Sequence, residues 1–260
     1  MGIKNMTLAQ QAHLMSVCSN LAYYDPTYST NRFKEIGFNS KLISKHESEA
    51  YVLSNSHDII IVFRGIQPTH FDDIEHALDI ELVPFYTCHV HAGFLDSVDN
   101  LWDLIIDDVQ NLTPTQRLWC TGHSLGGAMA LLFAVQLHQH PELPLTRSVF
   151  TFGCPRVGDR SFVNMISPIG ITHYRFVNNV DIVTQLPCSP YKHYTPMIYM
   201  NHWGNIRELT CWQLVKDRIR GIIKGLMEGK INFFENHQII RYCNNLAMWA
   251  NGREKPQDKY

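Results

Sequence analysis

Short apolar segments alternate along the chain with longer segments whose apolar residues recur at helical spacing. In the helical segment 91–112 this stripe is formed by Leu101, Leu104, Ile105 and Val109, and a Thr-Pro breaker follows it. Another helix is predicted over 125–135. Strands are predicted twice within 49–65 and once each in 117–122, 147–153 and 171–179. Strands that alternate with helices indicate a parallel, largely buried sheet, so we predict a single α/β domain over residues 1–260.

A second apolar stripe with helical spacing lies near the C-terminus. Its members are Ile206, Leu209, Trp212, Val215, Ile219, Ile222 and Leu226. The polar face of the same segment is net basic. It carries Arg207, Lys216, Arg218, Arg220 and Lys224 against Glu208 and Asp217. We expect this helix to pack on the core, and contact with the surface of a membrane is the alternative interpretation.

Composition, charge and motifs give no support for a nucleic-acid-binding protein or a metalloprotein. The chain has 45% hydrophobic and 18% charged residues and a net charge of -2, which gives no argument for nucleic-acid binding. It contains no C-x-x-C and no H-E-x-x-H motif, so no metal site is predicted. The pair His89 and His91 could touch a cation, but we expect it to pack or to cap a helix. The seven scattered cysteines are interpreted as buried free thiols.

The N-terminal segment is predicted to form an amphipathic helix, because Gln10, Gln11 and His13 interrupt its apolar residues. It therefore does not resemble a cleavable signal peptide. No apolar run approaches the length of a membrane span, so no transmembrane segment is expected. The expected location is either the cytoplasm or outside the cell after export without a cleaved signal.

The stretch "TGHSLGGAMALLFAV", residues 121–135, places one serine among glycines between a predicted strand and a predicted helix. This order is typical of the G-x-S-x-G nucleophile elbow, which holds the hydroxyl of Ser124 above the sheet. Gly122 and Gly126 leave room for the sharp bend. A glycine-rich turn in which the serine only caps the helix is the alternative.

A serine hydroxyl needs a histidine to remove its proton and a carboxylate to orient that histidine. In elbow hydrolases the acid and then the histidine follow the serine along the chain. Asp159 and Asp181 both qualify as the acid, although Asp159 is more easily a helix cap. The histidine candidates are His193, His202 and His237. The pattern of residues does not choose among them.

Five motifs, in this order, resemble the fungal-type class 3 lipases and their bacterial relatives: "VFRG", "HAGF", "TGHSLGGAMA", "TFGCPRVGD" and "RFVNNVDIVTQLP". The resemblance implies the α/β-hydrolase fold and places the acid at Asp181 and the base at His237. It implies an oxyanion hole formed by the backbone N–H groups of Leu125 and Ile66. The family usually has Ser or Thr where this chain has Ile66, so the backbone donor is kept and a hydroxyl is lost.

The expected activity is the hydrolysis of lipid esters, such as acylglycerols, through an acyl-enzyme and without a cofactor. The alternatives are a phospholipase A1, a short-chain esterase, or a catalytically silent module that binds lipid. The expected partners are a lipid ester substrate and a transient contact with a lipid interface.

The segment 67–89 breaks the α/β pattern. Apolar residues at helical spacing, Phe71, Ile74, Leu78 and Leu82, alternate there with acidic ones. We interpret it as a lid with an apolar inner face, which would cover an acyl groove in water. An ordinary surface helix and loop is the alternative.

Overall fold

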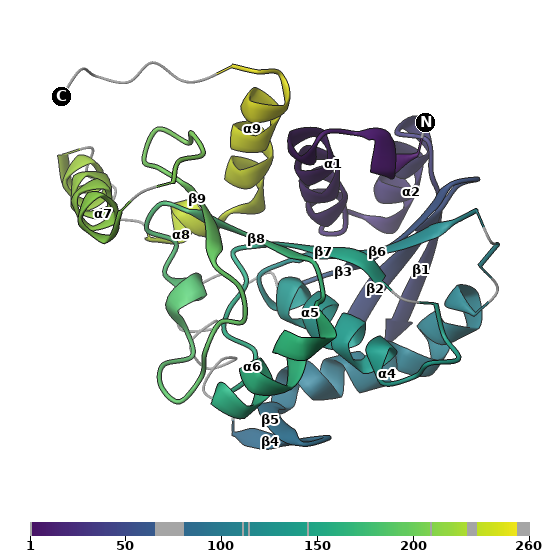
Figure 1. Ribbon diagram of the computed structural model, residues 1–260. Coiled ribbons are helices and arrows are strands. Elements are labelled where there is room, and N and C mark those ends of the chain that lie inside the picture. The colour runs from purple at the N-terminus through teal and green to yellow at the C-terminus, as the bar shows by residue number, and fades with distance from the viewer. Residues whose placement is uncertain are drawn as a thin grey trace.

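The computed structural model describes most of the chain (Figure 1). The described residues are 2–65, 81–110, 112–113, 115–144, 146–208, 210–227 and 233–253. Ile66 and most of the predicted lid therefore lie outside the described residues.

A seven-stranded sheet runs through the middle of the molecule (Figure 1). In spatial order its strands are β1 (Asn39–Lys45), β2 (Ser48–Ser54), β3 (Asp58–Phe63), β6 (Arg117–His123), β7 (Thr146–Phe152), β8 (His173–Asn178) and β9 (Met197–Met200). The pairs β1–β2 and β2–β3 are antiparallel, and every pair from β3 to β9 is parallel. The prediction of a mostly parallel sheet is confirmed.

Helices cover both faces of the sheet (Figure 1). On one face lie α1 (Leu8–Leu21), α2 (Pro26–Glu35) and α9 (Ile239–Ala250); on the other lie α4 (Ala92–Val109), α5 (Leu125–His138) and α6 (Arg160–Ile166). The remaining helical segments are η1 (Ile3–Asn5), η2 (Ser167–Ile169), η3 (Val183–Gln185), α7 (Cys211–Met227) and α8 (Phe233–His237). This layering is typical of a doubly wound α/β fold.

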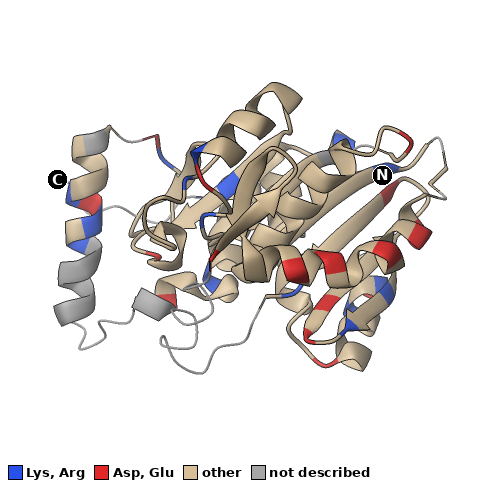
Figure 2. Ribbon diagram, turned by 90° about the horizontal axis from the view of Figure 1, so that it is seen from below, with Lys and Arg blue, Asp and Glu red and all other residues tan. Residues whose placement is uncertain are grey.

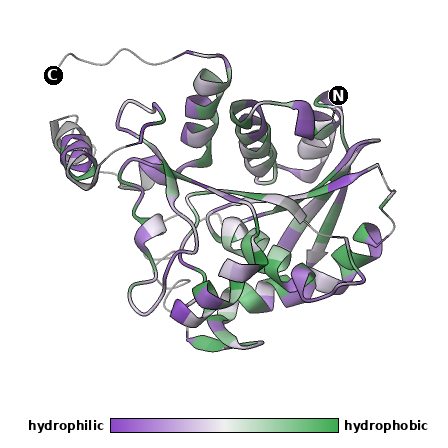
Figure 3. Ribbon diagram, viewed as in Figure 1, coloured by the Kyte–Doolittle hydropathy of each residue, from purple (hydrophilic) through white to green (hydrophobic). Residues whose placement is uncertain are grey.

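The two apolar cores follow from the alternation of side chains along buried strands. In β3, Ile59, Ile61 and Phe63 face the core beneath α4 and α5, whereas Ile60 and Val62 face the core beneath α1 and α9. All six residues of β3 are buried. Figure 3 shows the hydrophobic ribbon gathered around α5, whose side chains are almost all buried against the sheet and α4. This largely apolar helix thus forms the centre of one core.

Two helical stripes that the sequence predicts each include one residue too many at an end. Leu82 does not belong to a helix, because it begins β4 (Leu82–Phe85), which pairs with β5 (Cys88–His91) in a separate two-stranded sheet. Ile206 lies before α7 and bridges Met200 of β9. A tight turn causes this, because the Asn201 side chain accepts the N–H groups of residues 203 and 205 and directs the chain back along β9.

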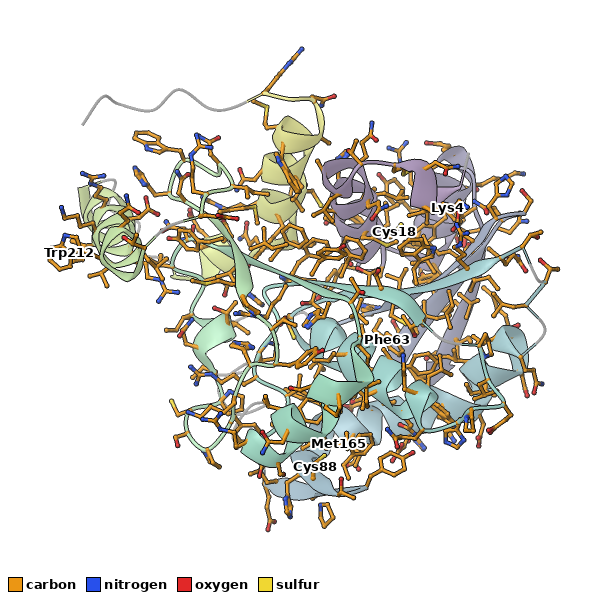
Figure 4. The ribbon with its side chains drawn as sticks, in the orientation of Figure 1. Lys4, Cys18, Phe63, Cys88, Met165 and Trp212 are labelled. Carbon is orange, nitrogen blue, oxygen red and sulfur yellow. The ribbon has the colours of Figure 1, made fainter. Side chains whose placement is uncertain are left out.

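The cysteines and the histidine pair behave as the sequence indicates. Six free cysteines are described, and all except Cys188 are buried. In Figure 4, Cys18 lies on the α1 side of the sheet and Cys88 lies with β5 on the opposite side. His91 caps α4 by accepting the N–H of Phe94 and stacks on the phenyl ring of that residue. His91 is therefore a packing and capping residue, whereas His89 is exposed near Asp159.

Among the described residues, no group of three His, Cys, Asp or Glu side chains is arranged to hold a metal ion. Within the same ranges, no helix is long and apolar enough to cross a bilayer.

Candidate active site

Ser124 occupies a sharp turn between the end of β6 and the start of α5. Its backbone has φ 57° and ψ −129°, a left-handed conformation that is costly for any residue other than glycine. A Cβ atom added at Gly122 or Gly126 would overlap backbone atoms, those of Gly126 and Phe63 respectively. The Ser124 side chain makes no capping hydrogen bond to α5. The elbow interpretation is confirmed, and the helix-cap interpretation is wrong.

Three side chains from distant parts of the chain meet beyond the carboxyl end of the parallel strands. The Oγ atom of Ser124 lies 2.8 Å from Nε2 of His237, the last residue of α8. Nδ1 of His237 lies 3.0 Å from both carboxylate oxygens of Asp181, which follows β8. All three side chains are buried. Parallel strands present their carboxyl ends at one edge, and this brings residues 124 and 181 together.

The contacts fix the tautomer of His237. A carboxylate only accepts hydrogen bonds, so Nδ1 carries the proton and donates it to Asp181. Nε2 is then an acceptor and takes a hydrogen bond from the Ser124 hydroxyl. This is the protonation state that a general base requires.

Asp181 is held as a carboxylate although it is fully buried. Burial alone would raise its pKa, but the nearby His237 and hydrogen bonds from His237 and Tyr242 lower it overall. The hydroxyl of Tyr242 donates to Oδ2 at 2.5 Å, and the N–H of Val183 donates to Oδ1 at 3.1 Å. Burial and the adjacent Asp181 carboxylate raise the pKa of Tyr242 well above its ordinary value, so its proton stays on the phenol.

The other candidate residues have structural partners. Asp159 caps α6 by accepting the N–H of Phe162 at 3.0 Å. His193 donates from Nε2 to the carbonyl of Thr184 at 2.7 Å, and burial lowers its pKa to about 3. His202 is paired with Asp217, with 2.5 Å between Nδ1 and Oδ1. The geometry brings together Ser124, Asp181 and His237, and it leaves these three alternatives away from the serine.

His123, the residue before the serine, holds the backbone of His237. Its Nε2 donates to the His237 carbonyl at 2.6 Å, so its Nδ1 is an acceptor for the hydroxyl of Tyr23 at 2.9 Å. Burial, together with the nearby His237, lowers the pKa of His123 to about 3 and keeps the ring neutral. The side chain of Asn178 holds Asn236, the residue before His237, by donating to its carbonyl oxygen at 2.9 Å.

Sequence reasoning missed Tyr242, Tyr23 and Asn178 as supporting residues. Tyr242 lies five residues after His237, one turn into α9, and Tyr23 follows α1 near the other end of the chain. A tyrosine next to "NHQII" is a weak local signal. Tyr23 has no sequence signal of this role, because only the packing of α1 onto β6 brings it to His123.

The predicted oxyanion hole is partly described. Leu125 is the first residue of α5, and N–H groups of a first helical turn have no partner within their own helix. Ile66, the second predicted donor, lies outside the described residues. A cavity of about 310 Å³ lies beside Leu125 and Gly65 and extends to Glu47 and Met129. The ion pair between Arg64 and Glu49 forms part of its wall.

Comparison with known proteins identifies the family. The sequence model of class 3 lipases matches residues 60–190. This chain belongs to the class 3 lipase family. The matched range contains Ser124 and Asp181 and ends before His237, so the position of His237 rests on the geometry above.

Relatives of this member of the class 3 lipase family include bacterial and fungal proteins. The toxin TseL of Vibrio cholerae is 31% identical over 234 residues, covering 70% of this chain and 36% of the relative. A lipase of Rhizomucor miehei is 38% identical over 136 residues, covering 50% of this chain and 37% of the relative. The chain thus spans little more than a third of the length of these two relatives.

Solved structures share the fold. The triacylglyceride lipase of Rhizomucor miehei superposes with a TM-score of 0.65 at 28% identity, covering 74% of this chain and 79% of that one. A triacylglycerol lipase described as having a serine protease triad at its catalytic centre gives a TM-score of 0.64 at 27% identity, with the same coverage of 74% and 79%. The predicted α/β-hydrolase fold is confirmed.

Proposed function

We propose that this chain hydrolyses carboxylic esters of lipids, with Ser124 as nucleophile, His237 as general base and Asp181 as the acid that orients it. The observation that carries the proposal is the continuous hydrogen-bonded line from Ser124 Oγ through His237 to Asp181, with distances of 2.8 and 3.0 Å. The family and the names of the relatives support the substrate class.

In the first half of the reaction Ser124 Oγ attacks the ester carbonyl carbon while its proton passes to Nε2 of His237. Asp181 stabilises the imidazolium that forms. The negative charge on the carbonyl oxygen is stabilised by the N–H of Leu125, with the predicted Ile66 N–H as second donor. When the tetrahedral intermediate collapses, the bond to the leaving oxygen breaks and His237 gives its proton to the departing alcohol. The acyl group remains on Ser124.

In the second half a water molecule takes the place of the alcohol. His237 removes a proton from this water as its oxygen attacks the acyl carbon. The second tetrahedral intermediate then releases the carboxylic acid, and the proton on Nε2 returns to Ser124 Oγ. Every proton transfer in this cycle uses one nitrogen of His237, so no cofactor enters the steps.

Acylglycerols are the proposed substrates, in line with the lipases and the secreted mono- and diacylglycerol lipase of Fusarium solani among the relatives. A phospholipase A1 of Arabidopsis thaliana is also a relative, at 32% identity over 107 residues, so phospholipids belong in the same assay. Released fatty acid, measured for each lipid at equal interfacial area, separates the two classes.

Kinetics of single variants test the proposal. The Ser124→Ala and His237→Ala variants should each lose ester hydrolysis to about one part in a thousand of the wild type or less, because triad members act as a unit. His193→Ala is the matched control and should keep most of the activity, because His193 bonds a backbone carbonyl. Substantial activity in the His237→Ala variant, together with its loss in the His193→Ala variant, would move the base to His193.

A further inference from the structure

The helix α7 is oriented against the usual rule, with polar residues toward the body and apolar residues toward solvent. Asp217, in its middle, is 4% exposed. Its carboxylate accepts the Tyr199 hydroxyl at 2.8 Å, the His202 N–H at 3.0 Å and His202 Nδ1 at 2.5 Å. Tyr199 belongs to β9, the last strand of the sheet. A buried polar cluster therefore attaches α7 to the sheet.

The apolar residues of α7 lie on its other side. Trp212, Val215 and Ile219 are 66%, 46% and 50% exposed. They are spaced i, i+3 and i+7, so they form one stripe on one face of the helix. Figure 4 shows Trp212 on the side of α7 that faces away from the sheet. Burying this stripe would be favourable, and the body of the molecule does not bury it. The expectation that this helix packs its stripe on the core is wrong for these three residues.

The charges beside the stripe are basic. Lys216 and Arg220 are exposed next to it, and Arg218 is half-buried. The Lys216 ammonium lies over the Trp212 ring, 5.3 Å from the ring centroid. The acidic residue among them, Asp217, is buried in its pair with His202. The exposed described side chains of α7 therefore combine an apolar stripe with positive charge.

Acidic side chains are gathered on a part of the molecule far from α7. The solvent side of α4 carries Asp96, Asp99, Asp103, Asp107 and Asp108. Figure 2 shows the acidic segments of this helix on the side of the molecule opposite α7. A negatively charged surface would attract the α7 end and repel the α4 end.

We propose that α7 is an interfacial helix that docks the protein on an anionic lipid surface. Trp212, Val215 and Ile219 would enter the boundary between head groups and acyl chains, while Lys216 and Arg220 contact the anionic head groups. The choice of a lipid occupant rests on the proposed function, whose substrates gather in lipid surfaces. A second copy of the chain is a poorer fit, because a symmetric contact through this face would bring the same basic residues together.

The polar cluster that attaches α7 lies close to the catalytic edge of the sheet. The oxygen of the Tyr199 hydroxyl that donates to Asp217 also lies 3.3 Å from Oδ1 of Asn179. Asn179 follows β8 and precedes Asp181 by two residues. The polar cluster under α7 and the acid of the candidate triad thus lie at the carboxyl ends of the neighbouring strands β9 and β8.

Vesicle binding by the full chain carrying Ser124→Ala tests the proposal, because this variant leaves the lipid intact. The probes are vesicles of phosphatidylcholine alone and vesicles with 30% phosphatidylglycerol, at about 0.1 M salt. We expect at least tenfold stronger partitioning onto the anionic vesicles, and this preference should weaken as salt is raised.

Two double variants separate the apolar and the charged contributions. Trp212→Ala with Ile219→Ser should lower partitioning at least tenfold on both kinds of vesicle. Lys216→Glu with Arg220→Glu should remove the preference for anionic vesicles, since each basic residue near such a surface contributes about fivefold. Leu104→Ser on α4 is the apolar control, and Lys4→Glu with Lys34→Glu is the charge control; both should bind like the parent.

The inference is overturned if the α7 variants bind as the controls do, or if the parent binds neither kind of vesicle. It is also overturned if light scattering shows a dimer that the Trp212→Ala and Ile219→Ser changes dissociate. Hydrolysis of a soluble short-chain ester, measured with Ser124 present, should be the same in all α7 variants. If the wild type hydrolyses no ester but the α7-dependent binding persists, the proposed function fails and the docking surface stands.

Discussion

At the scale of single residues, the buried carboxylate of Asp181 depends on a tyrosine that is not a member of the triad. The Tyr242 hydroxyl donates to Asp181 at 2.5 Å and in turn accepts the N–H of Asn178. One phenol therefore links the acid to the end of β8. Removing this hydroxyl would leave the carboxylate buried with fewer donors, which is unfavourable in a low-dielectric interior.

We expect the Tyr242→Phe variant to lose about 1.5 to 3 kcal/mol of unfolding free energy, the range for a hydrogen bond to a charged group. It should also lower kcat about tenfold with little change in KM, because it affects how the base is oriented and not how the substrate binds. Urea unfolding and steady-state hydrolysis of a soluble ester measure the two effects. A variant with wild-type kcat would show that Asp181 needs no support from Tyr242.

His123 offers a second test at the same scale. His123→Ala removes the donor to the His237 carbonyl and the acceptor for Tyr23, so the base should lose its fixed position. We expect kcat to fall by about ten- to a hundredfold, as for displaced catalytic groups. Labelling of Ser124 by a fluorophosphonate should slow in parallel. Equal rates in His123→Ala and the wild type would limit His123 to packing.

At the scale of elements, the strand, turn and helix around Ser124 form one tightly packed unit. Gly126, in the first turn of α5, lies against the backbone of β3, where a Cβ atom would overlap the carbonyl of Phe63. The helix can approach the sheet this closely because the residue has no side chain. The position of Ser124 depends on that approach.

Gly126→Ala should therefore destabilise the fold by more than about 3 kcal/mol and reduce hydrolysis, because backbone atoms cannot move aside cheaply. Gly170→Ala is the matched control. Gly170 has φ 72°, but an added Cβ would meet no atom within 4 Å, so we expect a cost of only about 1 kcal/mol. Thermal unfolding of the two variants gives the comparison, and equal stability losses would contradict the steric argument.

The elements with strong local patterns are those that the sequence predicts. Buried strands such as β3 and β8, the stripe of α4 and the elbow follow from apolar periodicity and glycine placement. The hairpin of β4 and β5 was missed because Leu82 continues a helical spacing by chance, and pairing with residue 91 decides its conformation. The outward stripe of α7 was missed because periodicity shows that a helix has an apolar face and does not show where that face points.

The candidate site also contains residues that a local motif predicts and residues that it does not. Ser124 follows from its local motif, whereas residues alone left two acids and three histidines open. The resemblance to class 3 lipases selected Asp181 and His237, and the geometry brings both to Ser124. The contacts of His123 and Tyr23 join residues a hundred positions apart, so no local pattern could have predicted them.

At the scale of the whole molecule, the buried His123 and the half-buried His173 and His193 make stability depend on pH. Burial lowers the pKa values of His123, His173 and His193 to about 3 in the folded chain. The ordinary value in an unfolded chain is about 6.5. Between pH 6.5 and 3 the unfolded chain thus binds more protons than the folded chain, so acidification through this window favours unfolding.

The free energy of unfolding should therefore change little between about pH 7 and 8 and fall below pH 6.5, by roughly 1.4 kcal/mol per pH unit for each histidine. Urea titrations at several pH values measure this slope. His173→Gln should lower the slope of unfolding free energy against pH by roughly 1.4 kcal/mol per pH unit, which corresponds to one proton. The matched change at the exposed His57 should leave the slope unchanged. A slope that His173→Gln does not alter would show that this ring is protonated in the folded state.

The central claim is that the side chains of Ser124, His237 and Asp181 work together as one nucleophilic unit. Its most direct test is covalent labelling of the full chain by a fluorophosphonate, with the modified peptide located by mass spectrometry. We expect one adduct, on Ser124, that forms rapidly in the wild type and in the His193→Ala variant. In the His237→Ala variant it should form at least a thousandfold more slowly. No adduct in the wild type, or an adduct on another residue, would contradict the account.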